Sequence, residues 1–420
     1  MPRHVGAADN RACSTGDPMV IHMPMAPLQV LTPSSIGSVE VRNRFIRSST
    51  SETLADEDGF ITPRYRALHQ ALARGGVGLI FTGHCYVHPS GKSIAGMTQM
   101  HDDDHIPQLR RLTDAVHAEG ARIFAQLQHA GSQSRAPEVV PIAPSVVPNP
   151  QFGRTPSEAT PPQIAEIIAA FGEAAGRVKA AGFDGVHVHA GHGYLISEFL
   201  SPASNLRRDE WGGSLENRQR FGLEVYRAMR AEVGPDFPIT WKLGLQDFVP
   251  GGLTLDEGFA TADRFGAEGV DAIEGSAGLM SPKAESAPMY VAVDTRRAFE
   301  DRLFHRMFKR PVAQAYFRDW ARELRRRLDC RVILVGGLRT TEVMESAIAD
   351  GDADFVSLAR PFIREPDLVR KIEAGKRGLV ECVSCNICLD HEGTHGLKCW
   401  RQSNRDLAAH AWLRATGKLH

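Results

Sequence analysis

A strand and the polar turn that follows it are encoded by residues 183–202, FDGVHVHAGHGYLISEFLSP. Residues 183–189 alternate between apolar and polar side chains, which is typical of a β-strand. His189 and His192 follow three positions apart, and Tyr194 comes two positions later. Two neutral imidazoles and a phenol can bind a carbonyl-like oxygen and transfer a proton. The pattern therefore predicts chemistry at the end of a strand. His187 lies one step deeper on the same strand, where we expect it to pack.

Seven further short apolar runs have the character of strands, and amphipathic stretches separate them. The expected strands are Arg44–Ser48, Val77–Thr82, Arg122–Gln126, Gly185–His189, Ile239–Leu243, Val270–Glu274, Val332–Val335 and Asp354–Leu358. The expected helices are Thr62–Arg74, Gln108–Glu119, Pro162–Ala181, Asn217–Val233, Thr254–Phe265, Gln314–Leu328 and Thr340–Ala349. Repeated strand–helix units favour parallel pairing with right-handed crossovers. A single-domain α/β fold, the (β/α)8 TIM barrel, is therefore expected.

Polar or glycine residues follow most of these strands. Gln126 ends the third strand, Lys242 the fifth, Gly336-Gly337 the seventh and Ala359-Arg360 the eighth. In (β/α)8 barrels the active site is built at the carboxyl ends of the strands. A doubly wound sheet would not concentrate polar residues at so many strand ends. His189 and His192 could also be metal ligands, but two imidazoles do not complete a metal site.

Composition and charge exclude several functional classes. The 420 residues carry a formal net charge of -1, which gives no electrostatic case for binding nucleic acid or an anionic membrane. No apolar run approaches the roughly 20 residues that span a bilayer. Seven cysteines in a chain of this size do not suggest a disulfide scaffold, so we expect a cytoplasmic protein. We expect a loose tail over 1–26, a barrel over 27–370 and a cysteine-rich extension over 371–420.

The last two strands predict a phosphate site. Gly336 and Gly337 allow backbone N–H groups to approach a phosphate, and Arg360 can add a charge-assisted hydrogen bond. Barrels commonly hold a phosphate in the loops after strands seven and eight. No glycine-rich dinucleotide motif follows a strand, so a nicotinamide cofactor would bind transiently on the barrel. The long connection Gly275–Pro311 is expected to cap the site.

Several ordered motifs between about Pro27 and Asp367 resemble the Old Yellow Enzyme family of FMN-dependent ene-reductases. They are Asn43–Ser51, Gln126–Gly131, His189–Leu195, Leu200–Pro202, Asn205, Arg208-Asp209, Trp211–Ser214 and Glu216–Arg218, with tryptophan at position 211 where tyrosine is commoner. The resemblance implies an FMN-binding barrel. The residues it assigns to FMN are Ser48, Ser49, Thr50, Ser51, His84, Gln126, Lys242, Gly336, Gly337, Ala359 and Arg360.

The resemblance also implies individual roles. Gln126 would bind the pyrimidine edge of the flavin, and Lys242 would lie near its N1 and O2 atoms. Ser51 stands where other members carry a cysteine or threonine that tunes the flavin potential. His189 and His192 would bind the oxygen of a small activated alkene. Tyr194 would then protonate the carbon on the face opposite the arriving hydride.

The implied reaction is reduction of activated C=C bonds by NADH or NADPH, with both substrates using one site in turn. The sequence does not choose between the two nicotinamides or identify the alkene. Homo-oligomers are common in the family. Two alternatives remain: an oxidative flavoenzyme, such as an amine dehydrogenase or N-demethylase, and a non-catalytic flavin-binding barrel. Oxidative relatives often replace the first histidine, so retention of His189 and His192 favours the reductase.

Four cysteines after the barrel form a C-x2-C-x2-C-x10-C series: Cys382, Cys385, Cys388 and Cys399. Relatives similar to 2,4-dienoyl-CoA reductase carry an iron–sulfur motif here, with a C-terminal FAD domain that supplies electrons. Their second spacing is typically one residue longer, and no FAD domain follows in this chain. Three interpretations stay open: reduced cysteines without a metal, a [4Fe-4S] cluster, or a zinc ion with His391 or His395.

Overall fold

The computed structural model describes residues 28–149, 152–280 and 314–419. The expected N-terminal tail, residues 1–26, lies outside the described residues. So does most of the connection expected over 275–311, including its predicted role as a cap.

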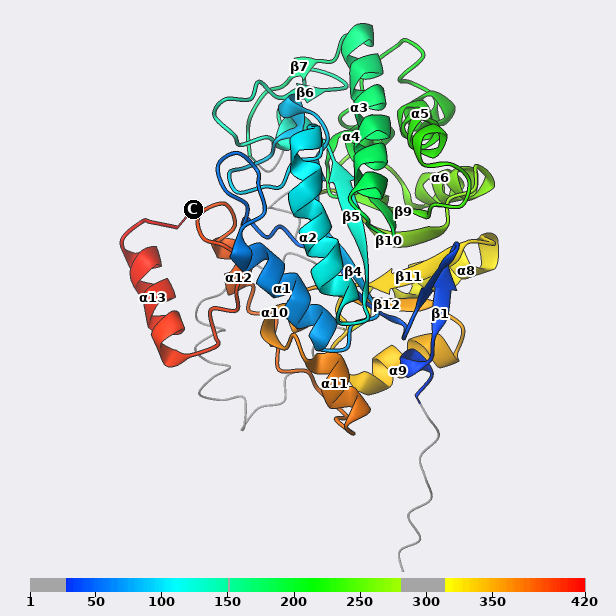
Figure 1. Cartoon of the computed structure of the whole chain (residues 1–420). Helices are drawn as coiled ribbons and strands as arrows, with labels where there is room; N and C mark the ends of the chain where they lie inside the picture. Colours follow the sequence, from blue (N-terminus) through cyan, green and yellow to red (C-terminus); the bar gives the residue numbers. More distant parts are fainter. Residues whose placement is uncertain (1–27, 150–151, 281–313, 420) are drawn as a thin grey trace, which may run out of the picture.

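Eight parallel strands close into a barrel, as the sequence predicts (Figure 1). Each strand pairs in parallel with the next along the chain, and the last pairs with the first. The pairing aligns His189 with Lys242, and Lys242 with Glu274. The strands are β3 (Phe45–Arg47), β4 (Leu79–Tyr86), β5 (Arg122–Gln128), β8 (Gly185–Ala190), β9 (Ile239–Phe248), β10 (Ala272–Met280), β11 (Arg331–Val335) and β12 (Phe355–Leu358).

All seven expected helices form, with ends that differ by up to four residues from the predictions. Thr62, Thr160 and Thr254 each accept a hydrogen bond from a backbone N–H of the first turn, which fixes where three of these helices begin. The helices are α1 (Pro63–Arg74), α2 (Ile106–His117), α3 (Pro161–Ala180), α5 (Leu215–Val233), α6 (Leu255–Ala267), α8 (Arg318–Arg327) and α9 (Thr341–Ala349).

The sixth strand is longer than expected. Residues 275–280 were expected to open a long loop, but they extend β10 to Met280. They are buried and continue to pair with β9 through two register shifts, because β9 itself runs on to Phe248. Two short elements were also missed: the hairpin of β1 (Ser34–Ile36) and β2 (Val39–Val41), and α4 (Leu195–Leu200), which begins directly after Tyr194.

The C-terminal segment forms four short helices: α10 (Arg360–Arg364), α11 (Leu368–Glu373), α12 (Ile387–Asp390) and α13 (Asn404–Ala415). It packs on the barrel, since the N–H of Leu397 donates to the carbonyl of Glu52 at 2.9 Å and Leu379 pairs with Thr340. In Figure 1 the red helix α13 lies at the outside of the molecule. The expected boundary at 370 stays a prediction.

The six cysteines within the described residues are all free of disulfide bonds. No helix among the described residues combines the length and apolar character that a membrane span requires.

Candidate functional site

One cavity brings together all the residues that the sequence assigned to the cofactor and the substrate. It lies where the barrel strands end, and its walls come from all eight strands or the turns after them. The predicted residues that line it are Ser48, Ser49, Thr50, Ser51, His84, Gln126, His189, His192, Tyr194, Lys242, Gly336, Gly337, Ala359 and Arg360. Convergence follows from the closed barrel, because parallel strands deliver their carboxyl ends to one rim.

His189, His192 and Tyr194 form a compact cluster in this cavity. The ring of His189 lies 5.0 Å from the ring of His192 and 4.5 Å from the ring of Tyr194, centre to centre. His192 adopts a positive φ of 57°, and its Nε2 is 2.9 Å from the hydroxyl of Ser276. The strained turn at His192 is held by its N–H, which donates to the carbonyl of Ala277 at 3.0 Å. Such strain is common where a side chain must be aimed at a ligand.

Both histidines of the cluster are neutral near pH 7. Burial and the nearby Lys242 ammonium lower the pKa of His192 to about 3. Burial, reinforced by His192 and His84, holds the pKa of His189 well below its usual value. The N–H of Gly191 donates to Nδ1 of His189 at 3.4 Å, which leaves the ring proton on Nε2. Neutral imidazoles can donate to a substrate oxygen without adding charge to the cavity.

The residues that line the cavity also include buried polar atoms that have no hydrogen-bond partner. They are Nε2 of Gln126, Oγ of Ser51 and Nδ1 of His84. Gln126 is oriented by Ser49, whose hydroxyl donates to its Oε1 at 2.7 Å. An unpaired buried donor costs about 1–3 kcal/mol. A planar heterocycle with carbonyl and ring nitrogen atoms on its edge would satisfy such groups, as the flavin of FMN can.

The other end of the cavity fits a phosphate. Gly336 and Gly337 have φ values of 103° and 68°, and a Cβ atom at Gly336 would lie 2.5 Å from the ring of Tyr316. Arg360 contacts the side chain of Asn386. Arg339, which the sequence did not single out, is 4% exposed and also lines the cavity. Burial, together with the charge of Arg360, lowers the pKa of Arg339. A buried guanidinium group beside a second, half-buried one favours an anion.

A buried ionic network lies beneath the cavity. Nζ of Lys242 is 2.5 Å from Oε2 of Glu274, and Nε2 of His187 is 3.2 Å from the same oxygen. The hydroxyl of Ser48 donates to Oε1 of Glu274 at 3.1 Å. His187 stacks on Phe81 with ring centres 3.8 Å apart, so it packs as expected and also takes part in the network.

Sequence reasoning missed several residues of the site, and three of them bear on its chemistry. Glu274 was recognised only as the end of a strand, although a charged residue at that place is itself a signal. Ser276 was assigned to a loop because the strand was expected to end at Glu274. Arg339 stands two positions after the glycine pair, close enough to have been considered as a second phosphate ligand.

The four C-terminal cysteines line a second cavity of about 90 Å³. Burial raises the pKa of Cys385 and Cys399, and that of Cys388 to about 12. A single water needs a cavity of about 15 Å³, so the space admits a polyatomic group. Within the described part of the chain, no three His, Cys, Asp or Glu side chains are arranged for a single metal ion. Cys388 lines both this cavity and the larger one.

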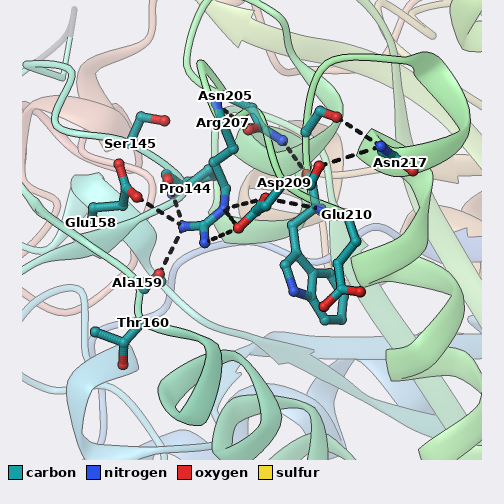
Figure 2. Close-up of polar contacts among 12 residues, drawn as sticks. Pro144, Ser145, Glu158, Ala159, Thr160, Asn205, Arg207, Asp209, Glu210 and Asn217 are labelled. Atoms are coloured by element: carbon teal, nitrogen blue, oxygen red, sulfur yellow. Dashed lines mark hydrogen bonds and ion pairs between the residues drawn. The ribbon is translucent and has the colours of Figure 1, made fainter.

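The loop after α4, whose motifs resemble those of the family, has a structural role. Figure 2 shows Arg207, whose Nη1 donates to the carbonyls of Ala159 at 2.7 Å and Pro144 at 3.1 Å. Its Nε and Nη2 bind the carboxylate of Asp209. Asn217 donates to the carbonyl of Asp209 at 3.3 Å. None of these residues lines the large cavity. The loop therefore ties β6 (Ile142–Ala143) and β7 (Ser157–Glu158) to the barrel.

The model of the NADH:flavin oxidoreductase / NADH oxidase family matches residues 29–378. The chain is 38% identical to an NADH oxidase of Thermoanaerobacter brockii, over 84% of this chain and 52% of that protein. It is 35% identical to an NADPH dehydrogenase of Geobacillus sp. (strain WCH70), over 80% of this chain and 91% of that protein.

Among solved structures, a 2-naphthoyl-CoA reductase in complex with 2-naphthoyl-CoA matches with a TM-score of 0.79 and 29% identity. The match covers 91% of this chain and 58% of that one, so the chain spans about half the length of several relatives. Other matches are named as dehydrogenases as well as reductases. The chain therefore belongs to the NADH:flavin oxidoreductase / NADH oxidase family, which confirms the resemblance of its motifs to the Old Yellow Enzyme family.

Proposed function

We propose that this enzyme reduces activated C=C bonds, such as those of α,β-unsaturated carbonyl compounds, with FMN as its cofactor. The observation that carries the proposal is the pair of neutral imidazoles, His189 and His192, beside Tyr194 in a cavity that also contains unpaired polar atoms suited to a flavin. FMN bound there would supply the hydride chemistry that couples oxidation of NAD(P)H to reduction of the alkene.

The residues of the chain have separate tasks in this reaction. His189 and His192 donate hydrogen bonds to the substrate oxygen, where negative charge develops as the hydride reaches the β-carbon. Because both rings are neutral, they stabilise that charge without forming a permanent ion pair with it. Tyr194 donates a proton to the α-carbon on the opposite face. One site serves the nicotinamide and the alkene in turn.

Other residues hold the cofactor. Arg339, Arg360 and the backbone at Gly336-Gly337 bind the phosphate group. Gln126, Ser51 and His84 use their unpaired buried atoms for the edge of the flavin ring. Lys242 supplies a fixed positive charge near the pyrimidine part of the ring, where reduction adds electron density.

Two other functions are less well supported. An amine-oxidising enzyme on the same barrel has no need of two hydrogen-bond donors aimed at a substrate oxygen, although some relatives are dehydrogenases. A flavin-binding protein without turnover has no need of the positive φ at His192 that aims this ring. Both alternatives are outcomes of the test.

The test separates the two half-reactions. Purified yellow protein is mixed with NADH or NADPH without oxygen, and cyclohexenone is then added while the flavin absorbance is followed. Bleaching by the nicotinamide and reoxidation by cyclohexenone support the proposal. Bleaching by an amine, with none by NADH or NADPH, would show an oxidative enzyme. His189→Ala is the matched variant: it should bleach normally and reoxidise slowly.

We also propose that Cys382, Cys385, Cys388 and Cys399 bind an iron–sulfur cluster. Three features support this proposal. The four cysteines line one cavity, and that cavity admits a polyatomic group. The surrounding residues also include Arg360, Arg364 and Arg401. Burial without a metal would leave the thiols of Cys385, Cys388 and Cys399 protonated, whereas thiolate ligands form when a metal replaces the proton. A cluster there would supply one-electron transfer to the flavin.

Anaerobically purified protein should contain iron and acid-labile sulfide in equal amounts. Cys385→Ser should lower both and leave the FMN content unchanged, because Cys385 does not line the larger cavity. Zinc in place of iron would indicate a structural site. Absence of both metals would refute the proposed cluster.

A further inference from the structure

Lys242 is joined to a carboxylate that the cavity does not expose. Nζ of Lys242 lies 2.5 Å from Oε2 of Glu274, and the side chains are 4% and 0% exposed. Lys242 lines the flavin cavity, but Glu274 does not. Glu274 therefore reaches the cavity through residues that line it, and Lys242 is the one that carries a charge.

Glu274 is held in place by several contacts. Its Oε1 accepts a hydrogen bond from the hydroxyl of Ser48 at 3.1 Å, and its Oε2 lies 3.2 Å from Nε2 of His187. The opposite nitrogen of His187 is 2.9 Å from the hydroxyl of Thr240, and Phe81 stacks on the ring. These contacts come from the turn after β3 and from β4, β8 and β9. The position of the carboxylate is thus fixed by four neighbouring parts of the barrel.

The titratable groups around Lys242 are Glu274, His187, His189 and His192. Burial lowers the pKa of all three histidines, so they are neutral near pH 7. Burial opposes ionisation of Glu274, but the Lys242 ammonium and the contacts with His187 outweigh it and bring the pKa of Glu274 below its usual range. Glu274 is accordingly the negative charge in this group that balances Lys242.

We infer that Glu274 is a positioning residue that keeps Lys242 protonated whether the flavin is oxidised or reduced. A buried lysine without a counter-charge loses its proton readily. It would then regain that proton when reduction places negative charge on the ring. With Glu274 present, the cation is already in place, and reduction by two electrons takes up one proton, at the flavin alone. This inference rests on the flavin placement proposed above.

The test is the midpoint potential of bound FMN as a function of pH in the wild-type enzyme and in Glu274→Gln. Above about pH 7, Lys242 in the variant should be neutral in the oxidised enzyme and take up a second proton on reduction. Each pH unit then changes the equilibrium by a further factor of ten, which steepens the slope by about 30 mV per pH unit for a two-electron couple. Equal slopes in the two proteins would overturn the inference.

Two controls isolate the lysine. Glu274→Asp keeps the carboxylate, and we expect the wild-type slope. In a protein that already carries Lys242→Met, adding Glu274→Gln should leave the slope of the midpoint potential against pH unchanged. No lysine remains at position 242 to titrate. If Glu274→Gln does not fold, the wild-type curve still decides, since a break to the steeper slope between about pH 7 and pH 9 would mean that Lys242 titrates despite Glu274.

The measurement needs bound FMN but no alkene. If wild-type protein reduces cyclohexenone and the slopes of wild type and Glu274→Gln agree, the role of Glu274 is refuted and the proposed function stands. If the slopes differ as expected and cyclohexenone is not reduced, the proposed substrate class is refuted alone. Wild-type protein that binds no FMN would overturn both.

Discussion

Glu198 makes the stability of this protein depend on pH in a direction opposite to that of most carboxylates. It lies on α4, the helix that begins after Tyr194, and its side chain is 1% exposed. The N–H of Ser132 donates to Oε1 of Glu198 at 3.1 Å, and the hydroxyl of Ser132 contacts the same oxygen. Burial raises the pKa of Glu198 to about 8, although these hydrogen bonds work against the shift.

The direction in which stability changes with pH follows from the difference in proton binding between the folded and the unfolded chain. In the unfolded chain Glu198 loses its proton near the ordinary value of 4.5, whereas in the folded protein it keeps the proton to about 8. The protonated carboxyl therefore stabilises the fold fully below about pH 4.5. This contribution is lost as pH rises to about 8, at about 1.4 kcal/mol per pH unit. The whole difference amounts to about 5 kcal/mol.

The perturbation is Glu198→Gln, which keeps the shape and removes the ionisable group. Urea unfolding at about pH 6 and pH 9 should give a free energy of unfolding that falls less with pH in the variant than in the wild type, by about 3 kcal/mol. Glu57→Gln, at an exposed position, is the matched control for the loss of a carboxylate. Parallel pH dependence in wild type and Glu198→Gln would refute the reasoning.

Three further predictions concern the cavity. Tyr194→Phe should slow reoxidation of reduced enzyme by cyclohexenone about 10²- to 10⁴-fold in stopped-flow measurements and leave reduction by NAD(P)H unchanged; equal slowing of both steps would exclude Tyr194 as the proton donor alone. Arg339→Met and Arg360→Met should each weaken FMN binding by about 1.5–3 kcal/mol in a fluorescence titration, and unchanged affinity would place the phosphate elsewhere. Gly336→Ala should destabilise the protein more than Gly351→Ala in thermal unfolding, because both have a positive φ but only the first methyl group meets a neighbouring ring.

The barrel could be predicted because its signals are local. The alternation of apolar and polar side chains indicates a strand such as Gly185–Ala190. A threonine cap marks the first turn of helices such as α3 and α6. Closure into a barrel then places the strand ends together, so His189, Gln126 and Gly337 could be assigned to one site without any knowledge of distances.

The network under the cavity could not be predicted in the same way. Glu274 and Lys242 are 32 positions apart, and only the register between β9 and β10 brings them into contact. The extension of β10 to Met280 depends on equal extension of β9, which a pattern within one strand does not reveal. The buried ion pair depends on how neighbouring strands pair, and this pairing is a property of the folded chain.

For a related reason, local sequence patterns could not predict where the C-terminal segment lies. Cys388, Leu389, Glu392 and Leu397 line the flavin cavity, although all follow the last residue matched by the family model. The carboxylate of Glu392 lies 3.2 Å from the guanidinium of Arg135, which extends from the turn after β5 and also lines the cavity. Because the family model matches the barrel residues of the cavity but not these four, differences in substrate preference between this protein and other members should arise where the C-terminal segment forms the wall. Any ligand bound by the cysteines would act on the same wall, since Cys388 belongs to both cavities.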